Sequence, residues 1–285
     1  MSGAGGGVDP HLPWPVRAST VARIARMTGA DDWLGLERVG PGRWRFELTG
    51  GLSRFDGKLF GGTGLAVATA LFAREAGRPV LWASVQFVAS ADLGDEIAGD
   101  VEVLAEGRRT TQLRLTASAG GRVVFTALGA AGLARDGGLE AQVATMPDVP
   151  PPEDCAPWLP RAPFPAAAGN RGWLDLSEIR EVPGLGDGMA LWARMLDHPH
   201  TPSSLGFLAD MVPSAVVRAA GRAGAGTSLD NAIRLGPAPE GDWVLVEFVP
   251  YFASGGYLHG SARLWSPEGV HLAVASQTAV AVLFD

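Results

Sequence analysis

The chain has 285 residues, of which 47% are hydrophobic and 19% charged, so it can bury a full core, and its length lies between one large domain and two of ordinary size. Its net charge of -7 argues against nucleic-acid binding, because phosphate contacts need a positively charged surface, and against general attraction to anionic membranes. The single cysteine, Cys155, excludes an internal disulfide and indicates a reducing compartment, and no apolar run is long enough to span a bilayer, so we expect a cytoplasmic protein.

The first half of the chain reads as one helix among several strands. Residues 1–19 lack the basic and apolar regions of a signal peptide, and we expect them to form a mobile leader. Residues 20–135 form the first predicted domain, in which the small and apolar residues at 61–75 predict a helix. Runs rich in β-branched and aromatic residues predict strands at 43–48, 80–90, 96–107, 109–118 and 123–132.

A proline-rich stretch divides the chain. Prolines cluster between residues 147 and 165, which favours an extended connection, and we expect residues 136–188 to form a linker. Residues 189–285 form the second predicted domain, with a helical region at 204–221. Strands are expected at 189–196, 228–236, 242–252, 257–266 and 270–284.

The same order of elements occurs in both halves, which indicates an internal repeat. One helix among antiparallel strands, written twice, predicts an α+β fold rather than a wound parallel sheet. When the halves are superposed on the turn glycines Gly121 and Gly269, Gly62 falls opposite Asp210. The same superposition brings Gly129 opposite Gln277, and an offset of 144 through the earlier strand brings Ser84 opposite Ser228. Only the second half carries a carboxylate, a hydroxyl and an amide together at the matched places, so we expect the functional groups in that half.

The motifs LFGGTGLAVATALFARE in the first half, and GFLAD, TSLDNAIRL and LAVASQTAV in the second, give the sequence its family resemblance. It resembles the double-hotdog acyl-CoA thioesterases of the thioesterase II type over roughly residues 35–135 and 189–285. The resemblance implies two hotdogs, each an antiparallel sheet wrapped around a central helix. It also implies catalytic roles for Asp210, Ser228 and Gln277. The stretch SLDNAIRLG departs from the family pattern, in which a His and an aromatic residue frequently follow the Asp.

Asp210 also stands out without the resemblance, because it is a lone carboxylate in the apolar run GFLADMVPSAVV. Pro213 fits best at the first turn of a helix, which would leave Asp210 beside free backbone N–H groups. On a helical wheel, however, Asp210 lies nearly opposite the apolar stripe, so the structural alternative is a solvated helix face or a charge that complements the helix dipole. At the start of the other predicted helix, Gly61 and Gly62 would allow close approach of the backbone, and we expect them to bind substrate.

Gln277 interrupts a strand that is apolar on both faces, so its amide is expected to be buried and to need partners. Ser228 precedes Asp230 by two residues on a predicted strand, and residues two apart share a face. The sequence therefore leaves open which of Ser228 and Asp230 faces the site.

These residue types fit thioester hydrolysis, which needs a water held against the carbonyl, a base and donors for the developing oxyanion. We expect acyl-CoA or another acyl-thioester as substrate, a cleft where the halves meet, no cofactor and no metal. A non-catalytic acyl-CoA or lipid-binding protein of the same fold is the alternative. A hotdog hydratase is disfavoured because neither predicted helix contains the required His. Apolar sheet faces could further support a homodimer.

Overall fold

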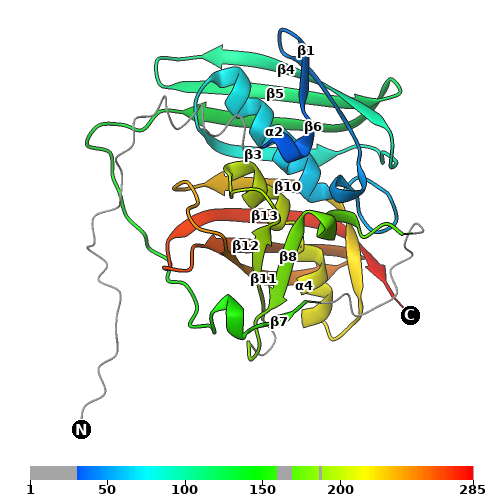
Figure 1. Ribbon diagram of the computed structural model, residues 1–285, viewed down its shortest axis with the longest axis vertical. Coiled ribbons are helices and arrows are strands. Elements are labelled where there is room, and N and C mark those ends of the chain that lie inside the picture. The colour runs from blue at the N-terminus through cyan, green and yellow to red at the C-terminus, as the bar shows by residue number, and fades with distance from the viewer. Residues whose placement is uncertain (1–30, 159–168, 186–187, 285) are drawn as a thin grey trace.

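The computed structural model describes residues 31–158, 169–185 and 188–284, and the predicted leader lies outside them. All thirteen strands of this part belong to one antiparallel sheet, in the order β1-β2-β4-β5-β6-β3-β10-β13-β12-β11-β9-β8-β7. Strands of the first half occupy one end of the sheet and strands of the second half the other (Figure 1). No helix in these ranges is long and apolar enough to cross a membrane.

In the first half, the predicted helix and strands are confirmed. Burial alternates along β5, as expected for a strand with one face on the core. Leu113, Leu115 and Ala117 are fully buried, whereas the residues between them are exposed or half-buried. Gly120 and Gly121 both have positive φ in the turn that follows. The elements are η1 (Asp32–Leu34), β1 (Glu37–Gly40), β2 (Arg43–Glu47), η2 (Gly50–Leu52), α2 (Gly61–Ala76), β3 (Val80–Phe87), β4 (Glu96–Glu106), β5 (Thr110–Ala119) and β6 (Arg122–Gly132).

In the second half, the strands are confirmed and the helical region is divided in two. Pro213 lies in the first turn of the second helix and cannot donate to the carbonyl of Ala209, so the chain turns at residues 209–211. This turn carries Asp210. The elements are β9 (Met189–Met195), α3 (Pro202–Leu208), α4 (Val212–Ala219), β10 (Gly224–Leu235), β11 (Val244–Ser254), β12 (Tyr257–Trp265) and β13 (His271–Leu283).

The segment predicted as a linker contributes structure of its own. It contains η3 (Pro152–Asp154), β7 (Ala156–Pro157), η4 (Gly172–Asp175) and β8 (Ser177–Glu181). β8 pairs with β9 and so extends the sheet of the second half. Earlier in the segment, the carbonyl of Pro150 accepts a hydrogen bond from Nε1 of the buried Trp192 at 2.8 Å. These residues therefore cover strands of the second half as well as connecting the halves.

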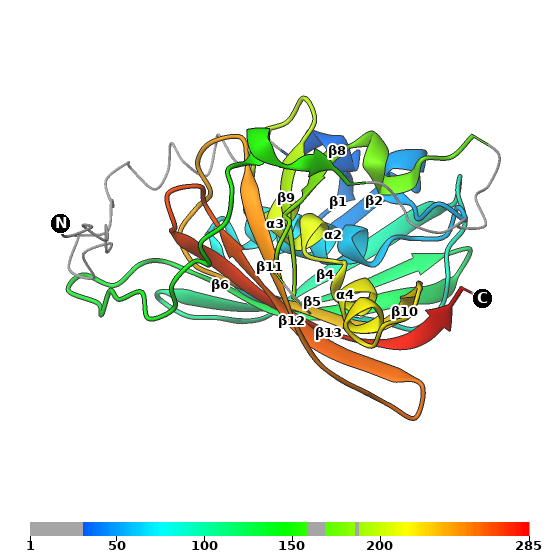
Figure 2. The same ribbon diagram turned by 90° about the horizontal axis from the view of Figure 1, so that it is seen from below.

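The expectation of two separate sheets needs correction, because β3 of the first half pairs with β10 of the second. The register places Ser84 opposite Ala232 and Val85 opposite Asn231. A strand at the edge of a sheet carries unpaired N–H and C=O groups, and here those of β3 and β10 form hydrogen bonds with one another. Each half still surrounds its own helix: α2 packs against β3, β4 and β6, and α4 against β10 to β13. In Figure 2 the helices lie inside the curve of the joined sheet.

Helices α2 and α3 bring the two halves into close contact at the first turn of α2. A Cβ atom on Gly62 would lie 2.4 Å from the carbonyl oxygen of Phe207, and one on Gly206 would lie 3.1 Å from the Leu65 side chain. Phe207 and Leu65 are fully buried in a core that includes residues of both halves. Small residues on both helices thus set the approach of the two halves.

Replacing Gly62 by alanine is expected to lower the free energy of unfolding by about 1–3 kcal/mol, because the added methyl group overlaps a backbone oxygen that cannot move freely. Urea unfolding followed by circular dichroism measures the change. Gly40→Ala is the matched control, since its Cβ would meet only the Arg43 side chain at 3.8 Å. Equal stability of the two variants would show that α2 and α3 can move apart enough to accommodate a methyl group.

Candidate active site

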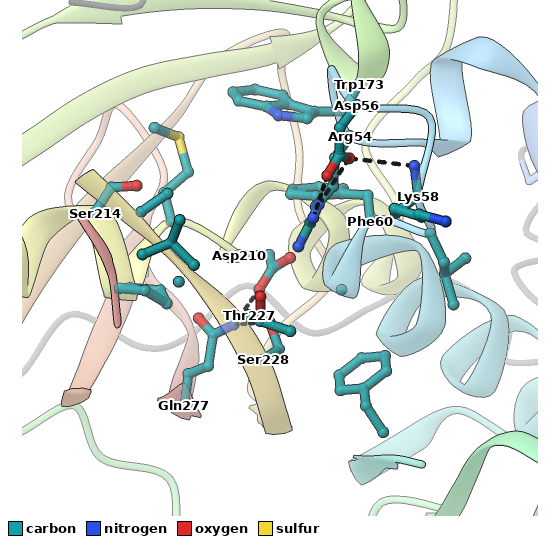
Figure 3. Close-up of a pocket in the computed structure, with 18 of the residues that line it drawn as sticks. Arg54, Asp56, Lys58, Phe60, Trp173, Asp210, Ser214, Thr227, Ser228 and Gln277 are labelled. Atoms are coloured by element: carbon teal, nitrogen blue, oxygen red, sulfur yellow. Dashed lines mark hydrogen bonds and ion pairs between the residues drawn. The ribbon is translucent and has the colours of Figure 1, made fainter. Parts of the chain in front are cut away.

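A cavity of about 400 Å³ opens where the two halves meet, beside the first turn of α2. Asp210, Ser228, Gln277 and Gly61 all line it, so the structure brings the predicted site residues together (Figure 3). Asp210 comes from the turn between α3 and α4, Ser228 from β10 and Gln277 from β13. Three separate elements of the second half thus converge on the helix start of the first.

The Asp210 carboxylate is 8% exposed and has hydrogen-bond donors on both oxygens. Oδ2 accepts from the backbone N–H of Gly62 at 2.6 Å. Oδ1 accepts from Nε2 of Gln277 and, at 3.1 Å, from Nδ2 of Asn231. The alternative of a solvated helix face is therefore wrong. A buried carboxylate with this many donors is held in a fixed orientation.

Burial raises the pKa of Asp210 to about 7, because a carboxylate loses its hydration in the interior. The N–H of Gly62, the amide of Gln277 and the charge of Arg54 act in the opposite direction, with a smaller contribution from the Gly61 N–H. These groups stabilise the ionised form without outweighing desolvation. Asp210 can therefore take up and release a proton near neutral pH, which is the property of a general base.

Gln277 links the carboxylate to the hydroxyl. Its Nε2 donates to Asp210 and also to Oγ of Ser228, at 2.7 Å in the second case. The side chain is 4% exposed, and its Oε1 is a buried acceptor with no hydrogen-bond partner in the described ranges. Because Ser228 Oγ accepts from Gln277, its own hydrogen is available to another group. The serine hydroxyl can therefore donate a hydrogen bond to a polar molecule in the cavity.

The open choice between Ser228 and Asp230 is decided by a β-bulge. The pairing of β10 with β13 shifts register between these two residues, so they do not share a face. Ser228 lines the cavity, whereas Oδ1 of Asp230 accepts a hydrogen bond from the backbone N–H of Thr278 at 2.8 Å. Asp230 thus holds the strand pair together.

The same bulge brings Asn231 to the site, and sequence reasoning missed this residue. Asn231 is 1% exposed and its only hydrogen bond from the side chain within the described residues goes to Asp210. Strict alternation would have placed Asn231 on the opposite face to Ser228. A signal was nonetheless present, because Asn231 directly follows Asp230, at the place where the sequence departs from the His of the family pattern. The asparagine supplies a donor there.

Gly61 and Gly62 contact the carboxylate directly. A Cβ atom on Gly61 would lie 2.7 Å from Asp210 Oδ2 and 2.9 Å from Ser228 Oγ, so any side chain at residue 61 would displace the site. The N–H of Gly62 has Asp210 as its partner. Their backbone groups therefore hold Asp210, and Gly61 alone of the two lines the cavity.

The remaining wall combines aromatic rings with charged side chains, which the sequence did not single out. Phe60 stacks on Trp173 of the linker segment, with ring centroids 5.4 Å apart and an interplanar angle of 11°. On the same side lie Arg54, Asp56 and Lys58. The cavity thus offers apolar surface for an acyl group and polar groups beside the Asp210 carboxylate.

Comparison with known proteins identifies the family. The family model of the acyl-CoA thioesterase N-terminal domain matches residues 49–132, and that of the C-terminal domain matches residues 152–281. The second match begins inside the segment that we predicted as a linker. No curated protein sequence matches the chain significantly.

Solved structures show the same relationship. A protein from Novosphingobium aromaticivorans assigned as a thioesterase is 33% identical, with a TM-score of 0.79 over 86% of this chain and 97% of that one. A hotdog-fold protein from Alicyclobacillus acidocaldarius is 23% identical (TM-score 0.73; 90% and 99% covered). An acyl-CoA thioesterase II from Mycobacterium marinum is 20% identical (TM-score 0.70; 90% and 99% covered). The chain belongs to the acyl-CoA thioesterase family.

Proposed function

We propose that the protein hydrolyses acyl-CoA to a free acid and coenzyme A, with water as the nucleophile and Asp210 as the general base. The observation that carries the proposal is the Asp210 carboxylate itself: it is buried, held by Gly62 and Gln277, and has a pKa of about 7. A base with a pKa near the working pH transfers a proton most effectively.

The water molecule would bind between Asp210, Ser228 and Gln277. The hydroxyl of Ser228 can donate a hydrogen bond to the water oxygen, and the carboxylate of Asp210 can accept a hydrogen from the water. As the water oxygen attacks the carbonyl carbon, its proton passes to Asp210 and the carbonyl becomes an oxyanion. Collapse of the tetrahedral intermediate breaks the C–S bond. The thiolate is a good leaving group and needs little acid catalysis.

We also propose that each half is one hotdog unit, the first within residues 20–135 and the second within residues 189–285. Each half surrounds its own helix, and the likeness to the Alicyclobacillus protein supports a hotdog fold. The pairing of β8 with β9 argues for assigning residues 177–181 to the second unit. The described part of residues 136–188 then serves both as a connection and as part of the second unit.

A homodimer and a cytoplasmic location stay predictions. Several large apolar side chains are exposed on the sheet of the described chain, and they could meet a second copy. They include Leu81, Leu128, Tyr251, Phe252 and Tyr257.

Hydrolysis by the wild-type protein is expected to rise with pH through about 7 and to level off above it, because only ionised Asp210 can accept the proton. Thioester loss from short-, medium- and long-chain acyl-CoAs, measured between about pH 5 and 9, gives this profile and the preferred acyl length. A profile that is flat or falls with pH would contradict Asp210 as the base. Tight acyl-CoA binding without release of thiol from any substrate would instead favour the binding-protein alternative.

A further inference from the structure

The guanidinium group of Arg54 occupies the cavity between two carboxylates. Its Nε donates to Oδ1 of Asp56 at 3.1 Å and its Nη2 forms an ion pair with Oδ2 of the same residue, so two parallel bonds fix the guanidinium plane. In Figure 3 the group extends from Asp56 toward Asp210. Its charge lowers the pKa of Asp210, yet the two side chains form no ion pair within 4.0 Å. Both side chains line the same cavity, so a molecule bound there can contact each of them.

The backbone that carries Arg54 is equally well fixed. The N–H of Arg54 donates to the carbonyl of Lys58 at 2.7 Å, and the N–H of Gly57 donates to the carbonyl of Arg54 at 3.0 Å. Asn170, from the segment between the halves, donates its Nδ2 to the Arg54 carbonyl at 2.9 Å. The side chain of Arg54 is therefore supported at both ends and need not reorganise when a charge forms beside it.

Asp56 is held in the same way. Burial alone would raise the pKa of Asp56, but the hydrogen bond and the charge of Arg54 outweigh burial and lower that pKa below its usual value. The backbone N–H of Lys58 adds a further donor at 3.2 Å. Asp56 thus stays ionised at the pH at which Asp210 titrates, and the two contacts between the Asp56 carboxylate and the Arg54 guanidinium persist.

The reaction needs a donor that the start of α2 does not supply. The N–H of Gly62 is occupied by Asp210, and the N–H of Gly61 also acts on that carboxylate. Lys58, the other cation that lines the cavity, forms an ion pair with Asp92. Nη1 of Arg54, by contrast, has no hydrogen-bond partner among the residues that the structure describes. A cation with a free N–H beside the base is well placed to meet a developing oxyanion.

We propose that Arg54 is a further catalytic residue, whose guanidinium, positioned by Asp56, contacts the thioester carbonyl oxygen and stabilises the oxyanion. The inference rests on the proposed hydrolysis. When the water oxygen bonds to the carbonyl carbon, the π electron pair moves onto the carbonyl oxygen beside Arg54, and the water proton moves to Asp210. The pair then returns to re-form the carbonyl as the C–S bond breaks, and the sulfur leaves with the electrons of that bond.

The test compares Arg54→Met with Arg54→Lys and with the matched control Arg45→Met. Arg45 is also held by carboxylates, Glu37 and Glu96, but lies on β2 away from the cavity. Circular dichroism and thermal unfolding establish that each variant folds. Values of kcat and KM are then measured across the pH range with an acyl-CoA that the wild type hydrolyses. Arg54→Ala is assayed with and without added methylguanidinium.

Arg54→Met is expected to lower kcat by about 10²- to 10³-fold with little change in KM, as the loss of an oxyanion donor does. The midpoint of the pH profile should also move upward, because a positive charge near Asp210 is removed. Methylguanidinium should restore part of the activity of Arg54→Ala, and Arg54→Lys should fall between Arg54→Met and the wild type. If Arg54 only braced the loop, the midpoint would still move, but kcat above the midpoint would change little and methylguanidinium would restore no activity.

Two results would overturn the inference alone: a folded Arg54→Met with kcat close to wild type, or a loss confined to KM, which would assign Arg54 to binding. If Arg54→Met does not fold, Asp56→Asn keeps the guanidinium and loosens its contacts with the side chain of residue 56, and unchanged kcat in that variant would count equally against it. Failure of the proposed hydrolysis is distinguishable, because the wild type itself would then release no thiol, and the role of Arg54 would fall with it.

Discussion

Replacing Asp210 by asparagine is expected to lower kcat for acyl-CoA hydrolysis by about 10²- to 10⁴-fold, the range typical for the loss of a general base. Asparagine has nearly the same shape but cannot accept the water proton. KM should change little, because the apolar lining that would bind the acyl group is intact. Release of thiol at about pH 8, where the wild-type carboxylate is ionised, gives the comparison.

Asp230→Asn is the matched control for this experiment. Asp230 is also a carboxylate of the second half and is two residues from Ser228, but it is bonded to the backbone N–H of Thr278 and does not line the cavity. Asp230→Asn should therefore keep the wild-type kcat. A folded Asp210→Asn that hydrolyses acyl-CoA as fast as this control would show that another group is the base.

Replacing Gln277 by leucine is the second change with a large expected effect. Leucine removes the donor to Asp210 and to Ser228 at once. Because a hydrogen bond to a charged group contributes about 1.5–3 kcal/mol, kcat should fall by about 10- to 150-fold. The pH midpoint should also rise, since the amide of Gln277 lowers the pKa of Asp210. Initial rates across the pH range measure both effects.

Gln112→Leu makes the corresponding change at an exposed position of β5, and no effect on the rate or on the pH midpoint is expected there. If Gln277→Leu lowered kcat without moving the midpoint, the amide would act on the water or the substrate and not through Asp210. The two variants together therefore separate positioning of the carboxylate from direct contact with the reactants.

The sequence was sufficient to predict most individual helices and strands, because the patterns that mark them lie within each element. Alternating burial marks β5, and Pro213 marks the first turn of α4. The joining of β3 to β10 was not predictable in this way, because it depends on two strand edges that are distant in the chain. β8 was missed for a similar reason: its sequence SEIRE is mostly polar, and only the neighbouring β9 gives it a partner.

The candidate site was predictable where one residue type in an unusual place carried the signal. Asp210 and Gln277 each interrupt an apolar run, and burial of both is confirmed. Asn231 was missed because a single extra residue in the bulge reverses which side chains face inward, and periodicity does not reveal a bulge. Arg54 was missed because it precedes α2 in an irregular loop, where its direction depends on Asp56 and Asn170.

The hydrogen bond between Gly62 and Asp210 joins the two positions that superpose when the halves of the chain are aligned. In a pair of identical single-unit chains, these positions would carry the same residue. Two aspartates would then face each other as like charges, and two glycines would leave no base. Fusion of the two units into one chain removes that restriction: one unit supplies the base, Asp210, and the other supplies the backbone N–H of Gly62 that holds it. The two halves can therefore differ in sequence and together form one asymmetric site. A substitution at either position then affects the site that both halves build.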